Sequence, residues 1–261
     1  MTKLSIITIN YNDVVGLKRT FESVVNQTWK EFEYIVIDGG SNDGSKEFLE
    51  ENNDQLTYWI SEPDKGIYNA MNKGINVANG EYLLFLNSGD FLYSRESFEK
   101  AKKVLEKAKK DIYYGNIIVR GQEDRLPTFP DTLSFNYFYT GTLHHPASFV
   151  RKSCLLEMGG DDESLKIVSD WKFFIVGIFK KGFSFEYFDE IVSVFDVGGV
   201  SSTNSSLMAE ERELVLAQEF PLFLSDYKEF NFLKYYSERA HFKSFIKMIL
   251  FIKSFFRINP R

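Results

Sequence analysis

Short apolar runs alternate with segments of helical hydrophobic spacing along the first 120 residues of the chain. The runs are rich in Val, Ile, Leu and Tyr and end in polar residues or glycine, which is typical of buried strands. Between them, apolar residues recur every three or four positions, as on the buried face of a helix. We therefore predict strands at residues 4–9, 33–37, 56–60, 82–86 and 111–120, and helices at residues 14–26, 44–52, 68–77 and 95–109.

Strands that alternate with helices of this length form right-handed β–α–β units around a parallel sheet. The predicted fold class is therefore α/β, with a mostly parallel, Rossmann-like central sheet flanked by helices. Beyond residue 120 we predict a loop at 121–145, helices at 164–179 and 207–220, and strand segments at 183–195 that break at Asp189 and Glu190. A glycine–serine loop at residues 198–201 is suited to closing over a bound ligand.

Polar residues follow four of the predicted strands, at residues 10–13, 38–41, 64–66 and 87–90. Open α/β sheets bind ligands at the edge where the carboxyl ends of parallel strands meet. The first of these turns lacks the glycines of a dinucleotide-binding fingerprint, and the chain has no P-loop motif. An edge rich in Asp and Asn instead suits hydrogen bonds to a base and ribose, with Mg or Mn bound by oxygen atoms near the phosphates.

Composition narrows the class of protein. With 261 residues, 44% hydrophobic and 16% aromatic, the chain has ample material for the core of an α/β domain. The single cysteine, Cys154, excludes an internal disulfide framework and is interpreted as a buried thiol in a reducing compartment. We expect neither a secretory signal nor a transmembrane helix, and therefore a cytoplasmic protein.

Charge is spread unevenly along the chain. The net charge is −6, yet residues 239–261 carry six Lys or Arg and no Asp or Glu. The acidic body argues against nucleic-acid binding, whereas the basic tail indicates an anionic partner. In residues 240–257 apolar residues keep a helical stripe with lysines at other positions. Such a helix can lie on the inner face of an anionic membrane, or pack on the body or on a second subunit.

Four sequence blocks together resemble a known family. They occupy residues 6–12, 36–45, 62–74 and 85–90. In this order they resemble the family 2 glycosyltransferases of the GT-A fold, and most closely the bacterial members that build polysaccharides. The resemblance, over about residues 3–200, implies a GT-A domain at 1–205 and a helical, basic and aromatic extension at 206–261. Within the domain, it implies a nucleotide-binding half at 1–120 and an acceptor-binding half at 121–205.

The resemblance implies a donor site on the first half. Asp38 would hydrogen-bond the uracil or another base, and Thr8 and Asn10 would line the same pocket. The residues implied near the ribose and diphosphate are Asp64, Lys65 and Asn72.

It also implies a metal site, in which Asp90, assisted by Asn87, would bind Mg or Mn. The family commonly has a second acidic residue where this chain has Gly89, so the number of protein ligands stays open.

An inverting sugar transfer needs a base that takes the proton of the acceptor hydroxyl. By the resemblance this base is Asp170, at the start of a helix, with Ser169 in place of a usual first acid. Trp171 beside it could stack on a sugar face. His145 matches the histidine of the family's acceptor loop and would lie near the diphosphate or the acceptor. A joint metal site with His144 is not expected, because adjacent residues of a strand point to opposite faces.

We therefore expect an inverting, hexosyltransferase-type enzyme. It would move a sugar from a nucleotide diphosphate sugar, with UDP the expected nucleotide, to a glycan or lipid-linked acceptor. Two alternatives stay open. A sugar nucleotidyltransferase shares an α/β nucleotide-binding core but normally has a Gly-rich loop near its amino terminus. An inactive glycan- or lipid-binding homologue would explain Gly89 and Ser169. No pattern in the chain specifies the sugar, the linkage or the oligomeric state.

Overall fold

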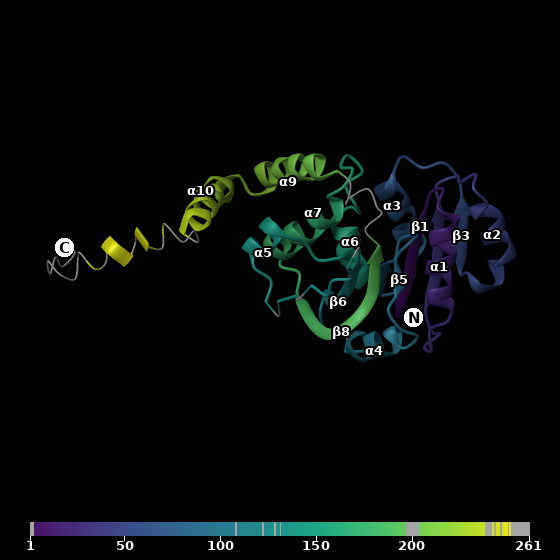
Figure 1. Ribbon diagram of the computed structural model, residues 1–261. Coiled ribbons are helices and arrows are strands. Elements are labelled where there is room, and N and C mark those ends of the chain that lie inside the picture. The colour runs from purple at the N-terminus through teal and green to yellow at the C-terminus, as the bar shows by residue number, and fades with distance from the viewer. Residues whose placement is uncertain are drawn as a thin grey trace. The chain divides into compact units, whose positions relative to one another are not determined.

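The computed structural model describes residues 3–107, 109–121, 123–127, 129–130, 132–196 and 204–237, together with 242, 244–245, 247–249 and 251. The chain divides into two compact units, Met1–Glu211 and Arg212–Arg261. The first unit carries a sheet with helices packed around it (Figure 1). The predicted glycine–serine loop at residues 198–201 lies outside the described residues.

Within the described residues, eight strands form one sheet in the order β3-β2-β1-β4-β7-β6-β8-β5. The strands are β1 (Leu4–Asn10), β2 (Glu33–Asp38), β3 (Tyr58–Ser61), β4 (Tyr82–Phe85), β5 (Phe91–Leu92), β6 (Ile112–Arg120), β7 (Ser148–Arg151) and β8 (Phe185–Asp196). Strands β1 to β4 are parallel to one another, and β6 is parallel to β8. β7 runs antiparallel to β4 and β6, and β5 runs antiparallel to β8. The predicted α/β class with a mostly parallel sheet is confirmed.

Twelve further elements connect and cover the strands in the part of the chain that the structure describes. The α-helices are α1 (Val14–Val25), α2 (Ser45–Glu51), α3 (Ile67–Val77), α4 (Ser97–Leu105), α5 (Phe135–Thr140), α6 (Lys152–Glu157), α7 (Ser169–Val176), α9 (Ser205–Glu219) and α10 (Pro221–Ser237). The shorter turns are the 3₁₀ segments η1 (Asn53–Gln55) and η2 (His145–Ala147) and the π-turn η3 (Gly177–Lys181). The loop predicted at 121–145 therefore contains α5, and the helix predicted at 164–179 begins only at Ser169.

Helices cover both faces of the parallel part of the sheet. All seven residues of β1 are buried, as expected for a central parallel strand. Leu17, Phe21 and Val24 of α1 join the main hydrophobic core on one face. On the other face α3 lies close to β1, and a Cβ on Gly74 would come within 2.5 Å of the Ile7 side chain. This packing fixes the carboxyl ends of the strands, where the polar turns begin.

The strand segments predicted at 183–195 form one continuous strand with an irregularity at the predicted break. The pairing of β6 with β8 shifts between Tyr114 and Asn116, where extra residues of β8, including Asp189–Glu190, bulge out of register. Gly115 lies against this bulge, since a Cβ there would be 2.8 Å from the carbonyl oxygen of Glu190. The two acidic residues therefore bend the strand without ending it.

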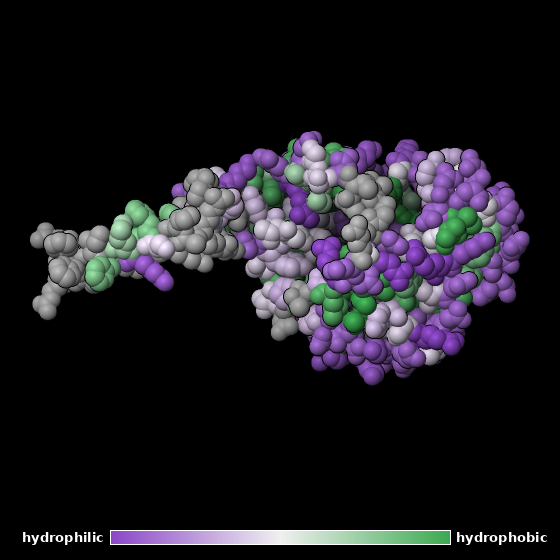
Figure 2. Space-filling view, in the orientation of Figure 1, coloured by the Kyte–Doolittle hydropathy of each residue, from purple (hydrophilic) through white to green (hydrophobic). Residues whose placement is uncertain are grey.

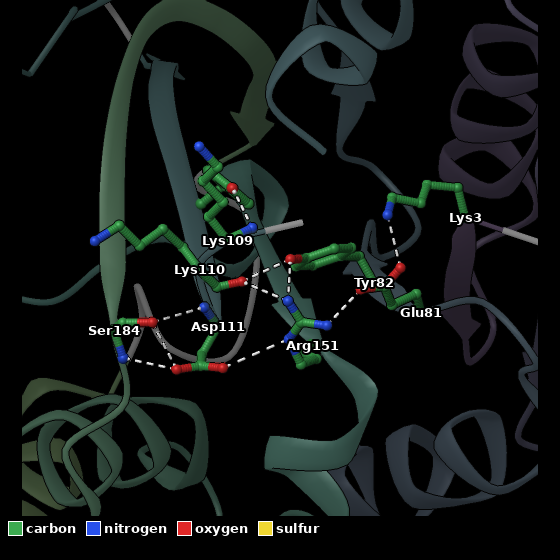
Figure 3. Close-up of polar contacts among 9 residues, drawn as sticks. Lys3, Glu81, Tyr82, Lys109, Lys110, Asp111, Arg151 and Ser184 are labelled. Atoms are coloured by element: carbon green, nitrogen blue, oxygen red, sulfur yellow. Dashed lines mark hydrogen bonds and ion pairs between the residues drawn. The ribbon is translucent and has the colours of Figure 1, made fainter. Parts of the chain in front are cut away.

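A cluster of charged residues lies at the amino-terminal edge of the sheet (Figure 3). Its centre is the Arg151 guanidinium, which contacts the Glu81 carboxylate, donates to the Tyr82 hydroxyl at 2.8 Å and lies 3.5 Å from Asp111. Glu81 also accepts from Lys3 at 2.6 Å. The cluster ties the antiparallel strand β7 to the segments that precede β1, β4 and β6.

The second unit holds the end of α9 and all of α10. Large apolar side chains are exposed on it, among them Leu222 at 84% and Phe251 at 68%, and hydrophobic surface is visible there in Figure 2. Among the described residues, no helix combines the length and apolar character that crossing a membrane requires. The stripe predicted at 240–257 falls mostly outside the described residues.

Candidate active site

Asp38 organises the end of β2 at the carboxyl-terminal edge of the sheet. Its carboxylate accepts hydrogen bonds from the Asn10 amide (2.7 Å), from the backbone N–H and the hydroxyl of Ser41 (2.9 and 2.6 Å), and from the Ser61 hydroxyl (2.6 Å). Burial alone would raise the pKa of Asp38, but these donors outweigh it and lower the pKa. The side chain is fully buried, so a base can reach it only if one of the serine hydroxyls turns away.

Thr8 and Asn10, which are also predicted to line the nucleobase pocket, differ in whether a polar atom of the side chain lacks a hydrogen-bond partner among the described residues. Thr8 is fully buried and donates to the carbonyl oxygen of Leu86 at 2.8 Å. Its side chain therefore ties β1 to the end of β4, so a side-chain contact with the nucleobase would need this hydrogen bond to open, and the lining of the pocket by Thr8 stays a prediction. Asn10 is buried as well, yet its Oδ1 has no hydrogen-bond partner among the described residues. A ligand N–H would satisfy that acceptor.

The residues predicted near the ribose and diphosphate lie along the next turn. The Asp64 carboxylate accepts from the Gly66 N–H at 2.8 Å and lies against Gly39, where a Cβ would come within 2.6 Å of it. Lys65 is exposed. Asn72 is engaged elsewhere: its amide bonds the backbone of Asp161 in both directions, at 2.9 and 2.7 Å. Asn72 thus holds the loop before α7, and its predicted ligand contact would need these bonds to open.

A cavity of about 460 Å³ opens beside the end of β4. The predicted residues that line it are Asn87, Asp90, His145 and Asp170. Sequence blocks far apart in the chain therefore converge on one site. The Asp38 cluster lies on the same edge of the sheet but outside the cavity lining.

The turn after β4 is shaped by a glycine and by a threonine of α1. Gly89 has a φ of +99°, which side-chain-bearing residues rarely adopt. The Thr20 hydroxyl donates to the carbonyl oxygen of Asp90 at 2.6 Å and accepts from the Gly89 N–H at 3.1 Å. An acid at position 89 would strain this turn, which explains why the residue is glycine here.

Oxygen atoms on this turn fit a hard divalent cation. The Asn87 Oδ1 and the Ser88 Oγ are buried and have no hydrogen-bond partner among the described residues. Burial raises the pKa of Asp90 to about 7, against the opposing influence of His145. A cation would favour the ionised form of Asp90 and satisfy the neighbouring oxygens. No group of three or more His, Cys, Asp or Glu suited to a metal occurs in the described ranges, so phosphate and water would complete the shell.

Asp170 lies in the first turn of α7 between two polar side chains. Its Oδ2 is 3.4 Å from the His145 Nδ1, and its Oδ1 is 3.5 Å from the Tyr68 hydroxyl. Burial lowers the pKa of His145, but the hydrogen bond and the charge of Asp170, with help from Asp90, raise it overall. Burial and then the charge of Asp170 raise the pKa of Tyr68. The carboxylate is thus held at the cavity wall while part of it stays exposed.

The two adjacent histidines lie at the start of η2 rather than on a strand, and they have separate environments. The His145 Nε2 is 3.2 Å from the Asn87 amide and 4.0 Å from Asp90. His144 instead packs its ring against Phe129 and Phe195. Burial lowers the pKa of His144 to about 4. His144 is therefore a neutral, partly exposed residue packed between aromatic rings, and His145 joins the turn after β4 to Asp170.

Trp171 does not face the cavity. Its side chain is 1% exposed and its indole N–H donates to the carbonyl oxygen of Phe138 at 2.8 Å. Residue 171 of the helix is directed into the core while residue 170 is directed outward, so the predicted stacking of Trp171 on a sugar would need the side chain to leave the core. Trp171 anchors α7 against α5.

Several site residues were not predicted from the sequence. Arg19, on α1, lines the cavity and pairs with Asp196 at 2.9 Å. Tyr68 lies within the family-like sequence block at residues 62–74, so the sequence did offer a reason to expect it near the site. Asp161 is 7% exposed and accepts from the Ser169 hydroxyl at 3.2 Å. Burial, and then the charge of Asp170, raise its pKa to about 7. For Arg19 and Asp161 no local pattern signals a role, since packing from distant elements defines their positions.

Comparison with known proteins identifies relatives of this chain. The family model described as "Glycosyl transferase family 2" matches residues 5–156. An uncharacterized glycosyltransferase of Mycobacterium tuberculosis is 36% identical over 176 residues, which are 66% of this chain and 67% of the relative. A PGL/p-HBAD biosynthesis glycosyltransferase of Mycobacterium bovis is 27% identical over 204 residues, which are 76% and 79% of the two chains.

Solved structures share the fold. TarS 1–349 of S. aureus matches with a TM-score of 0.66 and 20% identity, over 82% of this chain and 64% of that one. The chain therefore spans less than two-thirds of that TarS chain. TarS 1–349 has also been solved with UDP-GlcNAc (TM-score 0.64, 19% identity, 78% and 61% covered). A mannosyltransferase of Pyrobaculum calidifontis, solved with GDP-Man and Mn²⁺, matches at 0.60 with 16% identity, over 85% and 64%.

The structural matches confirm the predicted GT-A type of fold, and the family match covers most of the sheet and the turn that carries Asp90. Together with a relative of 36% identity, they establish that the chain belongs to glycosyl transferase family 2 and is a glycosyltransferase.

Proposed function

We propose that the enzyme transfers a sugar, with inversion, from a UDP-linked donor to a hydroxyl of a glycan or lipid-linked acceptor in polysaccharide or glycolipid synthesis. The observation that carries the proposal is that the carboxylate of Asp170 lines the same cavity as the oxygen-rich turn at Asp90. The relatives named for PGL/p-HBAD biosynthesis and the TarS complexes with UDP and UDP-GlcNAc support the classes of acceptor and donor.

The geometry around Asp170 supports its proposed role as the catalytic base. An acceptor hydroxyl is a weak nucleophile, and it attacks well only as its proton is removed. Asp170 takes that proton while the acceptor oxygen bonds to the anomeric carbon and the bond to the diphosphate breaks. Tyr68 and His145 hold the two carboxylate oxygens from either side. Their contacts aim the carboxylate at the cavity and limit its rotation.

The donor lies along the carboxyl edge of the sheet in this proposal. The nucleobase of the donor would contact the Asn10 Oδ1, which has no partner among the described residues, and the Asp38–Ser41 cluster at the end of β2. The diphosphate would reach the turn after β4, where Asp90 and Asn87 would hold Mg or Mn. When bound, that cation would supply charge that neutralises the departing diphosphate.

A peripheral membrane contact through residues 240–257 is part of the proposal. Its support is the set of exposed apolar side chains at Phe242, Phe245, Met248, Ile249 and Phe251. Lysines of the same segment would meet anionic headgroups.

Release of UDP or other nucleotides from a panel of nucleotide sugars tests the function. Wild-type enzyme with Mg or Mn should hydrolyse a UDP-sugar slowly without acceptor and faster with a glycan or lipid-linked acceptor. Transfer from a GDP- or dTDP-linked sugar alone would overturn the choice of UDP. Formation of a nucleotide sugar from a sugar phosphate would favour the nucleotidyltransferase alternative.

A further inference from the structure

Lys166 and Ile167 form part of the cavity wall, and Val168 follows them as the cap of the helix that carries Asp170. Glu211, on α9, is 7% exposed and accepts hydrogen bonds from three successive backbone N–H groups of this segment. The distances are 2.6 Å from Lys166, 2.9 Å from Ile167 and 3.3 Å from Val168. A buried carboxylate that is satisfied by three backbone donors fixes the conformation of the segment.

The side chain of Lys166 makes no ion pair within the part of the chain that the structure describes, although it lines the cavity. Arg19 also lines the cavity and is permanently charged, but its charge is paired. The Arg19 guanidinium pairs with Asp196 at 2.9 Å and lies 5.3 Å from the centre of the Phe91 ring. In a chain with more acids than bases, an unpaired ammonium on a cavity wall is a candidate for binding an anion.

Flexibility normally weakens such a lysine as a binding group, because ordering a long side chain costs entropy. Here the backbone of Lys166 is already ordered by Glu211, so only the side chain remains to be fixed. The same three hydrogen bonds also hold Val168, the residue that caps α7 two positions before Asp170. Glu211 therefore sets the positions of the ammonium and of the base together.

We propose that Glu211 is a positioning residue that presents the Lys166 ammonium to an anionic group of a substrate. That group is either the diphosphate of the donor or a charged group, such as phosphate, on the acceptor. The inference rests on the proposed glycosyl transfer. With the donor as source, the ammonium stabilises the negative charge that grows on the leaving oxygen as the bond to the anomeric carbon breaks and the diphosphate keeps the electron pair.

Calorimetric titration of Lys166→Gln with UDP and with uridine tests the ammonium and separates the two sources. If the donor diphosphate is the anion, the variant should bind UDP about ten- to a hundred-fold more weakly, the loss expected for one charge-assisted hydrogen bond. Uridine affinity should be unchanged, and Lys166→Arg should retain most of the UDP affinity. Lys46→Gln is the matched control, because the pair that Lys46 makes with Glu50, at 3.8 Å, is exposed and Lys46 does not line the cavity.

If the acceptor carries the anion, UDP affinity stays at the wild-type value and the acceptor KM rises by a similar factor. Either result supports the inference and names the source. The inference is overturned if Lys166→Gln stays within about two-fold of wild type in both UDP affinity and acceptor KM.

Glu211→Gln tests the positioning role, because one of the two acceptor oxygens becomes an NH₂ group that cannot accept from the backbone N–H groups it faces. Glu210→Gln, one residue away and exposed, is the matched control. If Glu211 acts through Lys166, its variant should weaken the same parameter as Lys166→Gln, and the double variant should be little worse than Lys166→Gln alone. Fully additive losses, or an unchanged Glu211→Gln, would overturn the positioning role.

The wild-type enzyme separates failure of this inference from failure of the proposed function. Wild type that neither binds UDP nor hydrolyses UDP-sugars contradicts the proposed UDP-dependent function. Wild type that does both, with a Lys166→Gln variant that behaves identically, contradicts only the role of Lys166.

Discussion

Polar side chains at the amino-terminal edge of the sheet bond to one another, whereas some at the carboxyl-terminal edge have buried atoms without a partner among the described residues. At the amino-terminal edge the Arg151 guanidinium contacts Glu81, Tyr82 and Asp111, and Asp111 in turn accepts from the backbone N–H and hydroxyl of Ser184 at 2.8 and 2.7 Å (Figure 3). At the carboxyl-terminal edge, buried oxygens of Asn10 and Asn87 lack partners among the described residues. Burial there raises the pKa of Asp90 to about 7.

The difference separates polar groups that hold the fold from those available to a ligand. A buried polar group without a partner costs free energy, so the Asn10 and Asn87 oxygens are candidates for hydrogen bonds or metal contacts with a ligand. Among the described residues, the Arg151 cluster contains no buried side-chain nitrogen or oxygen that lacks a hydrogen-bond partner. Substitutions at the two edges should therefore separate activity from stability.

Replacing Asp170 with Asn should have the largest effect. The amide keeps the shape but cannot accept the proton, so kcat should fall by about 10²–10⁴. UDP affinity and the denaturation midpoint should stay close to wild type. Asp54→Asn, an exposed substitution of the same chemistry on η1, is the control. Turnover near the wild-type rate would remove Asp170 as the base.

Asp161→Asn should stabilise the protein at high pH only. The carboxyl has an ordinary pKa of 3.8, which the fold raises to about 7. Between these values the folded protein binds a proton that the unfolded chain lacks, so stability falls as pH rises and the cost is complete above pH 7. The variant should gain on the order of 2–4 kcal/mol at pH 8 and nothing below about pH 4. Urea unfolding at both pH values measures this, and an equal gain at both would contradict it.

Asp38→Ala should weaken UDP binding with a smaller effect on turnover at saturating donor. A lost hydrogen bond to a charged group costs about 1.5–3 kcal/mol, whether Asp38 meets the base itself or holds Asn10 and Ser41 in place for it. Calorimetric titration with UDP measures the loss. If the folded variant binds UDP as tightly as wild type, the uracil binds elsewhere in the protein.

Arg151→Met should lower stability and leave UDP affinity unchanged. Loss of the guanidinium leaves Glu81 and Asp111 with fewer partners at a partly exposed site, which should cost about 1–2 kcal/mol of unfolding free energy. Because the cluster lies at the opposite edge from the cavity, UDP affinity should not change. A loss of UDP affinity in the folded variant would show that the two edges are coupled.

Local sequence predicted much of the parallel half of the sheet and the position of its polar edge. β1, β2 and β4 are compact apolar runs that end at or next to Asn or Asp, so a local pattern defines both the element and its turn. The residues of the turn at 87–90 could be identified for the same reason. Beyond residue 120 the pattern weakened, because β7 and β8 depend on pairing with distant strands.

Roles that depend on orientation or long-range contact could not be predicted. Trp171 follows Asp170 directly, yet helix geometry directs it into the core. Thr8 lies in a recognised block but faces Leu86. Glu211 meets Ile167 across 44 positions of the chain, and only the folded structure brings them together.

The anomeric configuration of the released sugar tests the central claim, a single displacement with Asp170 as base, most directly. Time-resolved proton NMR of an α-linked UDP-sugar undergoing hydrolysis by wild type should show the β-anomer first, before mutarotation. Asp170→Asn should release neither anomer at a comparable rate. First appearance of the α-anomer, or an unchanged rate in the variant, would contradict the account.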